Sequence, residues 1–174
     1  MRTDCALNII LIGMPGAGKS TVGVLLAKRL GYQFVDTDLL LQTQQRCRLQ
    51  QIIAHVGLNA FKQIEADVLC NLETSHSVVA TGGSAVYSER AMARLKKLGQ
   101  LVFIDIPLEE LLERVNDMDN RGLVIGPDET YEHLYTERQP LYRKYAEVVI
   151  SGGGLTVEAV ASTIEKWVCN PTDE

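Results

Sequence analysis

Features that would indicate a membrane or nucleic-acid-binding protein are missing from this chain of 174 residues. No apolar run approaches the roughly 18 residues that a membrane-spanning helix needs, so we expect no membrane association. The net charge is -5, and the sequence lacks the clustered lysine and arginine that a nucleic-acid surface requires. We therefore expect no nucleic-acid partner, and we expect any bound phosphate to belong to a small molecule held by a few cations.

Disulfide and metal-binding patterns are missing as well. The cysteines form no C-x-x-C pair, and no histidine lies near them at metal-ligand spacing; the residues are Cys5, Cys47, Cys70, Cys169, His55, His76 and His133. This scatter is typical of reduced thiols in a reducing compartment. The opening segment, residues 1–13, has an apolar stretch too short for a membrane span and no small-residue cleavage site. We expect no secretory signal and a cytoplasmic protein.

The pattern that is present indicates a single α/β domain. Short apolar runs alternate with longer stretches of helical period, which is typical of βαβ units and a parallel sheet. We predict strands at 7–12, 33–36, 77–81, 101–106 and 147–150. Helical period recurs at 19–30, 61–73, 90–99, 108–115 and 156–168. These elements predict a buried parallel sheet of five strands, covered by helices on both faces.

A phosphate-binding loop is the most specific motif in the chain. The segment "GMPGAGKST", residues 13–21, fits G-x-x-x-x-G-K-[ST], and a predicted strand precedes it while a predicted helix follows it. Loop N–H groups and the positive end of that helix would converge on one anion. Lys19 would reach the β- and γ-phosphates, and Ser20 would offer its hydroxyl to Mg²⁺. The motif predicts a nucleoside triphosphate with Mg²⁺, and an ordinary glycine turn is the alternative.

Two carboxylates follow the second predicted strand in "FVDTDLL". Asp36 and Asp38 are two residues apart, which places them on the same side of an extended chain. One of them could face Mg²⁺ and the other could accept a proton from a substrate hydroxyl. The alternative is that Asp38 only caps the N-terminus of a following helix. Because parallel strands present their carboxyl ends at one edge, we expect both residues near the phosphate loop.

Two further segments are rich in turn residues. The stretch "VVATGGSAV", residues 78–86, delivers two glycines to the same sheet edge, where they would let a ligand approach the backbone or would form a tight turn. Residues 116–129 have mixed charge, two glycines, a proline and no helical period. A loop of this length in a compact domain is a candidate lid, and a surface connection is the alternative.

In their order and spacing, these motifs resemble the shikimate kinase family over nearly the whole chain. The segments that carry the resemblance are the phosphate loop, "VDTDLL", "VVATGGSAV", "RGLVIGPD" and "RQPLYRKYA". The resemblance implies a P-loop kinase fold whose five-stranded parallel sheet has the order 2-3-1-4-5, a substrate-binding helical region over residues 38–70, and a mobile lid. It also implies transfer of the γ-phosphoryl group of ATP to the 3-hydroxyl of shikimate, and a monomeric chain.

The resemblance assigns roles on the nucleotide side of the site. Lys19, Ser20 and Asp36 match the nucleotide and Mg²⁺ positions, and Arg114 matches a residue that packs on adenine. The residues expected at the nucleotide are Gly16, Ala17, Gly18, Lys19, Ser20, Thr21 and Arg114. Taken without the family, Arg114 would be read as part of a solvated helix face.

Further roles are implied on the acceptor side. Asp38 matches the aspartate at the acceptor hydroxyl, Arg121 matches a lid arginine that closes on the transferring phosphate, and Arg138 matches an arginine that binds the substrate carboxylate. Without the family, Arg138 too would be read as solvated. The residues expected at the acceptor are Asp38, Lys62, Gly82, Gly83, Ser84 and Arg138. Phosphoryl transfer depends mainly on positioning and charge neutralisation, which these residue types supply.

The sequence departs from the family pattern at three acceptor-side positions. Ser84 replaces a third glycine, Leu58 replaces a glutamate, and Lys62 replaces an arginine of the motif G-E-x-x-F-R. Lys62 keeps a positive charge without the planar fork that binds a carboxylate through two bonds. Glu65 lies three residues further along the predicted helix, so we expect it to pair with Lys62. The departures permit either a weaker shikimate kinase or a relative that acts on a different hydroxy acid or polyol. A nucleotide-binding regulatory module without transfer activity is a separate alternative.

Overall fold

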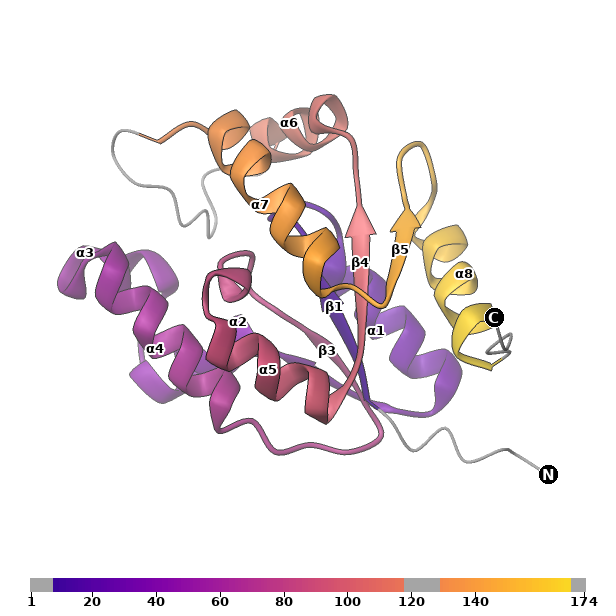
Figure 1. Ribbon diagram of the computed structural model, residues 1–174, viewed down its shortest axis with the longest axis horizontal. Helices are drawn as coiled ribbons and strands as arrows, with labels where there is room; N and C mark the ends of the chain where they lie inside the picture. The colour runs from indigo at the N-terminus through magenta and orange to yellow at the C-terminus, as the bar shows by residue number, and fades with distance from the viewer. Residues whose placement is uncertain (1–7, 118–128, 170–174) are drawn as a thin grey trace.

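The structure is a computed structural model that describes residues 8–117 and 129–169. One parallel sheet has the strand order β2-β3-β1-β4-β5 (Figure 1). The strands are β1 Asn8–Ile12, β2 Gln33–Asp36, β3 Ser77–Ala80, β4 Gly99–Asp105 and β5 Val148–Ser151. The predicted α/β fold and strand order are confirmed. Among the strands, the largest difference from the predicted bounds is at β4, which begins at Gly99 rather than at residue 101.

The central strand, β1, positions the phosphate loop. Every residue of β1 is buried, and the strand pairs on one side with β3 and on the other with β4. Such continuous apolar runs are typical of parallel strands that helices cover on both faces. The loop that follows β1 therefore leaves the middle of the sheet at its carboxyl edge, where ligands bind in open α/β folds.

Helices cover both faces of the sheet (Figure 1). Helix α1 packs against α8 on one face, while α5 and α7 lie on the other. The helices are α1 Lys19–Leu30, α2 Thr37–Gln45, α3 Leu49–Val56, α4 Leu58–Cys70, α5 Glu89–Leu98, α6 Leu108–Asp117, α7 Tyr131–Tyr145 and α8 Val157–Cys169, with a 3-10 turn η1 at Ala85–Tyr87. Within the described residues, none of these helices combines the length and the apolar character needed to cross a membrane.

Residues 38–70 cover all but the first residue of α2 and the whole of α3 and α4, and these helices form a small layer beside the sheet (Figure 1). These helices share an apolar cluster of their own, distinct from the main core, made of Leu41, Leu49, Ile52, Phe61 and Val68. The cluster ties the three helices together, so the side chains on the inner faces of α2 and α4 are held in place beside the carboxyl edge of the sheet.

The predicted lid, residues 116–129, is described only at its ends. Helix α6 extends through Asp117, so the first two of these residues are helical rather than part of a loop. Thr130 caps α7 through its side chain, which accepts a hydrogen bond from the backbone N–H of His133. Residues 118–128, including Arg121, lie outside the described part of the chain.

Candidate active site

The phosphate loop is shaped by glycines with positive φ. Gly16 has φ 83° and Gly18 has φ 86°, both in the left-handed region that residues with a Cβ rarely adopt. Gly18 is also the N-cap of α1, and as a glycine it has no side chain that could accept a hydrogen bond from the first N–H groups of that helix. The first N–H groups of a helix carry partial positive charge, and an anion that binds there is stabilised.

Lys19 is held at the centre of the loop. Its ammonium group donates hydrogen bonds of 2.8 Å to the carbonyl oxygens of Gly13 and Met14, and the residue is only 8% exposed. Burial lowers the pKa of Lys19 to about 8, although the nearby carboxylate of Asp38 acts in the opposite direction. A buried cation with a lowered pKa gains stabilisation when an anion such as phosphate comes close.

Asp36 links the phosphate loop to α2. Its Oδ2 accepts a 2.7 Å hydrogen bond from the Ser20 hydroxyl, and its Oδ1 accepts from the backbone N–H groups of Asp38 and Leu39. Asp36 is therefore the N-cap of α2, and the alternative that Asp38 is the cap is wrong. The expected extended chain through both aspartates is also wrong, because the helix begins at Thr37 between them. The strand-to-helix turn nevertheless keeps both carboxylates at the cavity.

The Ser20 and Asp36 oxygens fit a hard divalent cation. A hydroxyl and a carboxylate at hydrogen-bonding distance present the oxygen ligands that Mg²⁺ prefers, and Mg²⁺ in phosphoryl-transfer sites is usually held by one or two protein groups plus substrate phosphates. Residues 8–117 and 129–169 contain no cluster of three or more histidine, cysteine or acidic side chains suited to a metal. A cation here would therefore take the rest of its ligands from phosphate oxygens and water.

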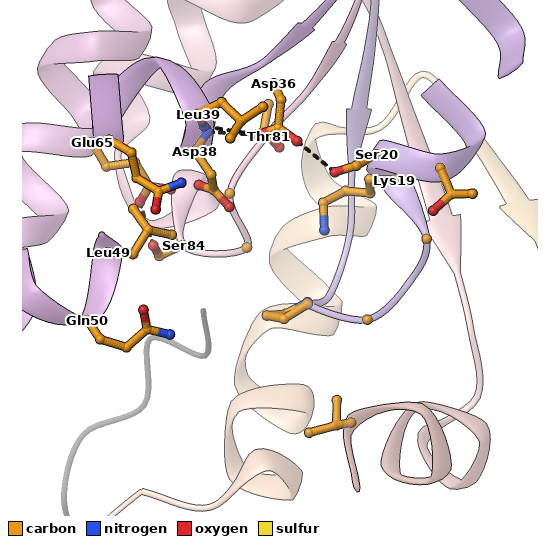
Figure 2. Close-up of a pocket in the computed structure, with 18 of the residues that line it drawn as sticks. Lys19, Ser20, Asp36, Asp38, Leu39, Leu49, Gln50, Glu65, Thr81 and Ser84 are labelled. Atoms are coloured by element: carbon orange, nitrogen blue, oxygen red, sulfur yellow. Dashed lines mark hydrogen bonds between the residues drawn. The ribbon is translucent and has the colours of Figure 1, made fainter. Parts of the chain in front are cut away.

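The half-buried Asp38 and the buried Glu65 form an acidic pair opposite Lys19 (Figure 2). Burial, together with repulsion by Asp36, raises the pKa of Asp38 to about 6, although Lys19 acts in the opposite direction. Burial also raises the pKa of Glu65 to about 7. Gly82 leaves room for the pair, because a Cβ at that position would collide with Glu65 and would lie 2.8 Å from Oδ1 of Asp38.

Glu65 does not pair with Lys62, contrary to expectation. The Ser84 hydroxyl donates a short hydrogen bond to Oε2 of Glu65. The Lys62 ammonium instead lies 4.3 Å from the centroid of the Tyr87 ring. Among the described residues no Lys62–Glu65 ion pair occurs. Although both residues lie on α4, the buried carboxylate is satisfied by Ser84 and the half-buried lysine is drawn to an aromatic face.

Arg138 is buried, so its alternative placement on a solvated helix face is wrong. The residue is 1% exposed, and its Nε donates a 3.0 Å hydrogen bond to the hydroxyl oxygen of Tyr87. Its Nη2 is buried and has no hydrogen-bond partner within the described residues. Four residues on, the Tyr142 hydroxyl donates to the carbonyl oxygen of Gly83, and this bond ties α7 to the glycine turn. An unpaired buried guanidinium nitrogen is costly unless an anion binds it.

Arg114 lies at the rim of the phosphate loop. Its Nη1 donates a 3.2 Å hydrogen bond to the carbonyl oxygen of Gly16, and its Nη2 donates a 2.5 Å bond to Glu110 on the same helix. Glu110 also accepts from the backbone N–H of Gly154, in the loop after β5. Arg114 thus has a fixed position beside the loop rather than a place on a solvated face.

Most of the predicted site residues line one cavity of about 1370 Å³ (Figure 2). The predicted site residues that line this cavity are Gly16, Gly18, Lys19, Ser20, Thr21, Asp36, Asp38, Gly82, Gly83, Ser84, Arg114 and Arg138. Ala17 is buried beneath the loop. Lys62 lines a neighbouring cavity of about 490 Å³, and Glu65 and Ser84 line both cavities. The Ser84–Glu65 hydrogen bond therefore lies where the two cavities meet.

Sequence reasoning missed several residues near the site. Tyr87 contacts Arg138, and Tyr142 contacts Gly83. The Tyr131 hydroxyl donates a 2.6 Å hydrogen bond to the carbonyl oxygen of Pro15. Tyr142 follows Arg138 by four residues in "RQPLYRKYA", a helical spacing that indicates a shared face. No comparable signal exists for Tyr87, because its partners come from distant parts of the chain.

Comparison with known proteins identifies relatives over almost the full chain. The family model described as shikimate kinase matches residues 15–169. A shikimate kinase of Francisella tularensis subsp. novicida is 34% identical over 169 residues, which cover 95% of this chain and 96% of the relative. A shikimate kinase of Thermodesulfovibrio yellowstonii is 37% identical over 162 residues, which cover 91% of this chain and 93% of the relative.

Solved structures agree in fold. Shikimate kinase from Acinetobacter baumannii, determined in complex with shikimate, has a TM-score of 0.88 at 30% identity, covering 97% of this chain and 96% of that chain. Shikimate kinase from Aquifex aeolicus has a TM-score of 0.78 at 35% identity, covering 91% of this chain and 94% of that chain. With the family model and the full-length relatives, these likenesses show that the chain belongs to the shikimate kinase family.

Proposed function

We propose that this protein transfers the γ-phosphoryl group of ATP to the 3-hydroxyl of shikimate. The observation that carries the proposal is that Lys19, Asp38 and Arg138 line one cavity in a chain of this family. A phosphate-loop lysine, a carboxylate with a raised pKa and a buried arginine are the groups needed for a phosphate, an acceptor hydroxyl and an acceptor carboxylate.

The nucleotide would bind over the phosphate loop. In this proposal the loop from Gly16 to Thr21 surrounds the phosphates, Lys19 neutralises the β- and γ-phosphates, and Arg114 packs on the adenine. Ser20 and Asp36 would hold Mg²⁺, which when bound neutralises charge on the phosphates. Positive φ at the loop glycines and the open N-terminus of α1 support this arrangement, because both direct backbone N–H groups toward an anion.

Asp38 would serve the chemical step. The acceptor hydroxyl oxygen forms a bond to the γ-phosphorus as the bond from that phosphorus to the β,γ-bridging oxygen breaks, and ADP leaves. The hydroxyl proton passes to the Asp38 carboxylate. A pKa of about 6 leaves Asp38 largely ionised at neutral pH and makes it a stronger base than an exposed aspartate. Lys19, across the cavity, would offset the charge that develops on the transferring phosphate.

The acceptor would lie between Asp38 and Arg138. Arg138 has a buried Nη2 without a partner among the described residues, which suits a ligand carboxylate. The Gly82–Gly83 backbone and Ser84 would form the floor of this part of the site, and Lys62 would add positive charge beside it. Arg121, outside the described residues, is proposed as the lid arginine that closes on the transferring phosphate.

We further propose that residues 1–174 form one kinase domain that acts as a cytoplasmic monomer. The length suits a single core, and the reaction consumes ATP, which is abundant in the cytoplasm. The acidic net charge of -5 supports a small-molecule acceptor rather than a nucleic acid.

The test is incubation of the protein with ATP, Mg²⁺ and shikimate, followed by detection of shikimate 3-phosphate. We expect product, and we expect ADP release to depend on shikimate. Absence of product at millimolar shikimate would contradict the proposed activity. Tight ATP binding without acceptor-dependent ADP release would instead favour a nucleotide-binding regulatory module.

A second candidate function keeps the chemistry but changes the acceptor. The observation that favours it is that the Lys62 ammonium contacts Tyr87 and lines a different cavity from Arg138. With Lys62 in the other cavity, an acceptor carboxylate would meet one cation, Arg138, where the family pattern provides two arginines. A screen of quinate, gluconate and other hydroxy acids tests this candidate, and a clear preference for shikimate in kcat/KM would count against it.

A further inference from the structure

Tyr87 contacts both acceptor-side cations. Its hydroxyl oxygen accepts the 3.0 Å hydrogen bond from Nε of Arg138, and its ring lies 5.1 Å from the Arg138 guanidinium carbon and 4.3 Å from the Lys62 ammonium. The two cations come from different helices, α7 and α4, and the Glu137 carboxylate on α7 also interacts with Tyr87.

The position of Tyr87 is fixed by the backbone around it. Tyr87 is the last residue of η1, and its N–H donates a 3.1 Å hydrogen bond to the carbonyl oxygen of Ser84. Ala85 and Val86, which precede it, are both buried in the main core. Ser88, which follows it, caps α5 through its side chain. Tyr87 therefore belongs to a short turn that is held in place on both sides, between the glycine turn and α5.

We propose that Tyr87 is a positioning residue for the acceptor site, which sets the direction of the Arg138 guanidinium and holds Lys62 on its ring. This inference rests on the proposed function. Because Nε of Arg138 donates to Tyr87, the acceptor carboxylate must bind through the Nη end of the guanidinium. The buried Nη2, which lacks a partner among the described residues, lies at that end.

The chemistry of the ring explains why one residue can hold two cations. An aromatic face attracts lysine and arginine by its quadrupole, and the attraction grows as water is excluded. A tyrosine adds a hydroxyl that accepts a hydrogen bond in the plane of the guanidinium. The attraction of each cation to the ring offsets part of the repulsion between the Lys62 and Arg138 charges. The Glu137 carboxylate, which interacts with Tyr87, offsets a further part.

The positioning role of Tyr87 is tested by comparing Tyr87→Phe with Tyr87→Leu. The phenylalanine keeps the ring and removes the hydrogen bond to Arg138, whereas the leucine removes both. We expect KM for shikimate to rise about tenfold in Tyr87→Phe and about thirtyfold or more in Tyr87→Leu, with kcat and KM for ATP changed less than about twofold. Tyr145→Phe, which removes a phenolic hydroxyl from the same helix as Arg138, serves as the matched control and should leave every constant unchanged.

A second readout does not depend on the acceptor. The Nε–H resonance of Arg138, assigned by through-bond NMR correlation, should exchange slowly with solvent in the wild type and at least about ten times faster in Tyr87→Phe. Unchanged exchange in Tyr87→Phe, or an unchanged KM for shikimate, would overturn the positioning role. Failure of the proposed function would look different, because the wild-type protein would form no shikimate 3-phosphate while the exchange measurement would still report on Tyr87.

Discussion

The two sides of the cavity are built in different ways. On the nucleotide side, the loop between β1 and α1 supplies backbone N–H groups, one lysine and one serine from a single short segment. On the acceptor side, side chains from α2, α4, η1 and α7 converge from across the chain. The first side depends on local backbone conformation, and the second depends on how separate helices pack. We expect substitutions on the two sides to change different kinetic constants.

The largest effect should come from the nucleotide side. Lys19→Ala removes the only buried ammonium among the described residues, so charge on the transferring phosphate would lose its main neutralising group. We expect kcat/KM for ATP to fall by about 10³-fold or more, measured by ADP release in the presence of shikimate. Lys28→Ala, an exposed lysine on the same helix, is the control. Wild-type activity in Lys19→Ala would refute the role of the loop.

Asp38→Asn tests the boundary between the two sides. The amide cannot accept the acceptor proton, so we expect kcat to fall by about 10²- to 10⁴-fold while KM for ATP changes little. A fall in ATP affinity without loss of kcat would place Asp38 on the nucleotide side instead. Glu113→Gln, an exposed acid on α6, is the control.

The same variant should also change stability. The pKa of Asp38 in the folded protein is about 6, above its ordinary value of 3.8, so above that pH the folded state holds a carboxylate that burial disfavours. Asp38→Asn should therefore raise the free energy of unfolding at pH 8 by roughly 1 to 3 kcal/mol. The gain should shrink as pH falls from about 6 to about 4, where the native carboxyl is protonated. Denaturant unfolding at both pH values measures it, and a pH-independent gain would point to packing rather than charge.

The pH dependence of kcat/KM should report on both sides of the cavity. Below about pH 6 the Asp38 carboxyl is protonated and cannot accept a proton, and above about pH 8 Lys19 loses its charge. We expect kcat/KM for ATP to follow a bell between these apparent pKa values. Bound phosphate favours charged Lys19, so the alkaline limb of kcat should lie at higher pH than that of kcat/KM. A profile without an alkaline limb in kcat/KM would contradict the lowered pKa of Lys19.

The smallest effect is expected at Lys62. Lys62→Arg introduces a planar fork that can bind a carboxylate through two bonds, so KM for shikimate should fall by about three- to tenfold with kcat unchanged. The exposed residue Lys96 on α5 provides the control Lys96→Arg. An increase in KM would indicate that the acceptor side is adapted to a different hydroxy acid.

The success of the sequence analysis differs between the two sides. The loop around Lys19 was predicted residue by residue, because glycine spacing and the flanking strand and helix are local signals. Helix α1 has the predicted bounds of 19–30. The Asp36 cap was missed, since it depends on where α2 begins, and helix ends are poorly encoded in local pattern.

The acceptor side was predicted only in part. The family resemblance pointed to Arg138 and Ser84, but the pairing of Glu65 with Lys62 was wrong and Tyr87 was not identified. The Ser84–Glu65 bond joins residues 19 apart in sequence, and the Arg138–Tyr87 bond joins residues 51 apart. Neither separation has a periodicity that could reveal it. Residues 118–128, with Arg121, lie outside the described residues, so the lid remains a prediction.

The sequence by itself determined the strands and the phosphate loop of this protein, because apolar period and glycine spacing act over a few residues. The order of its motifs indicated the family, and the resemblance to that family implied the strand order. Tertiary structure alone decided which partner each buried charge has. Glu65 accepts from Ser84, and Arg138 and Lys62 meet at Tyr87. The physical reason is that a buried charge must find a partner within hydrogen-bonding or aromatic contact distance, and packing of α4, η1 and α7 determines which groups come that close.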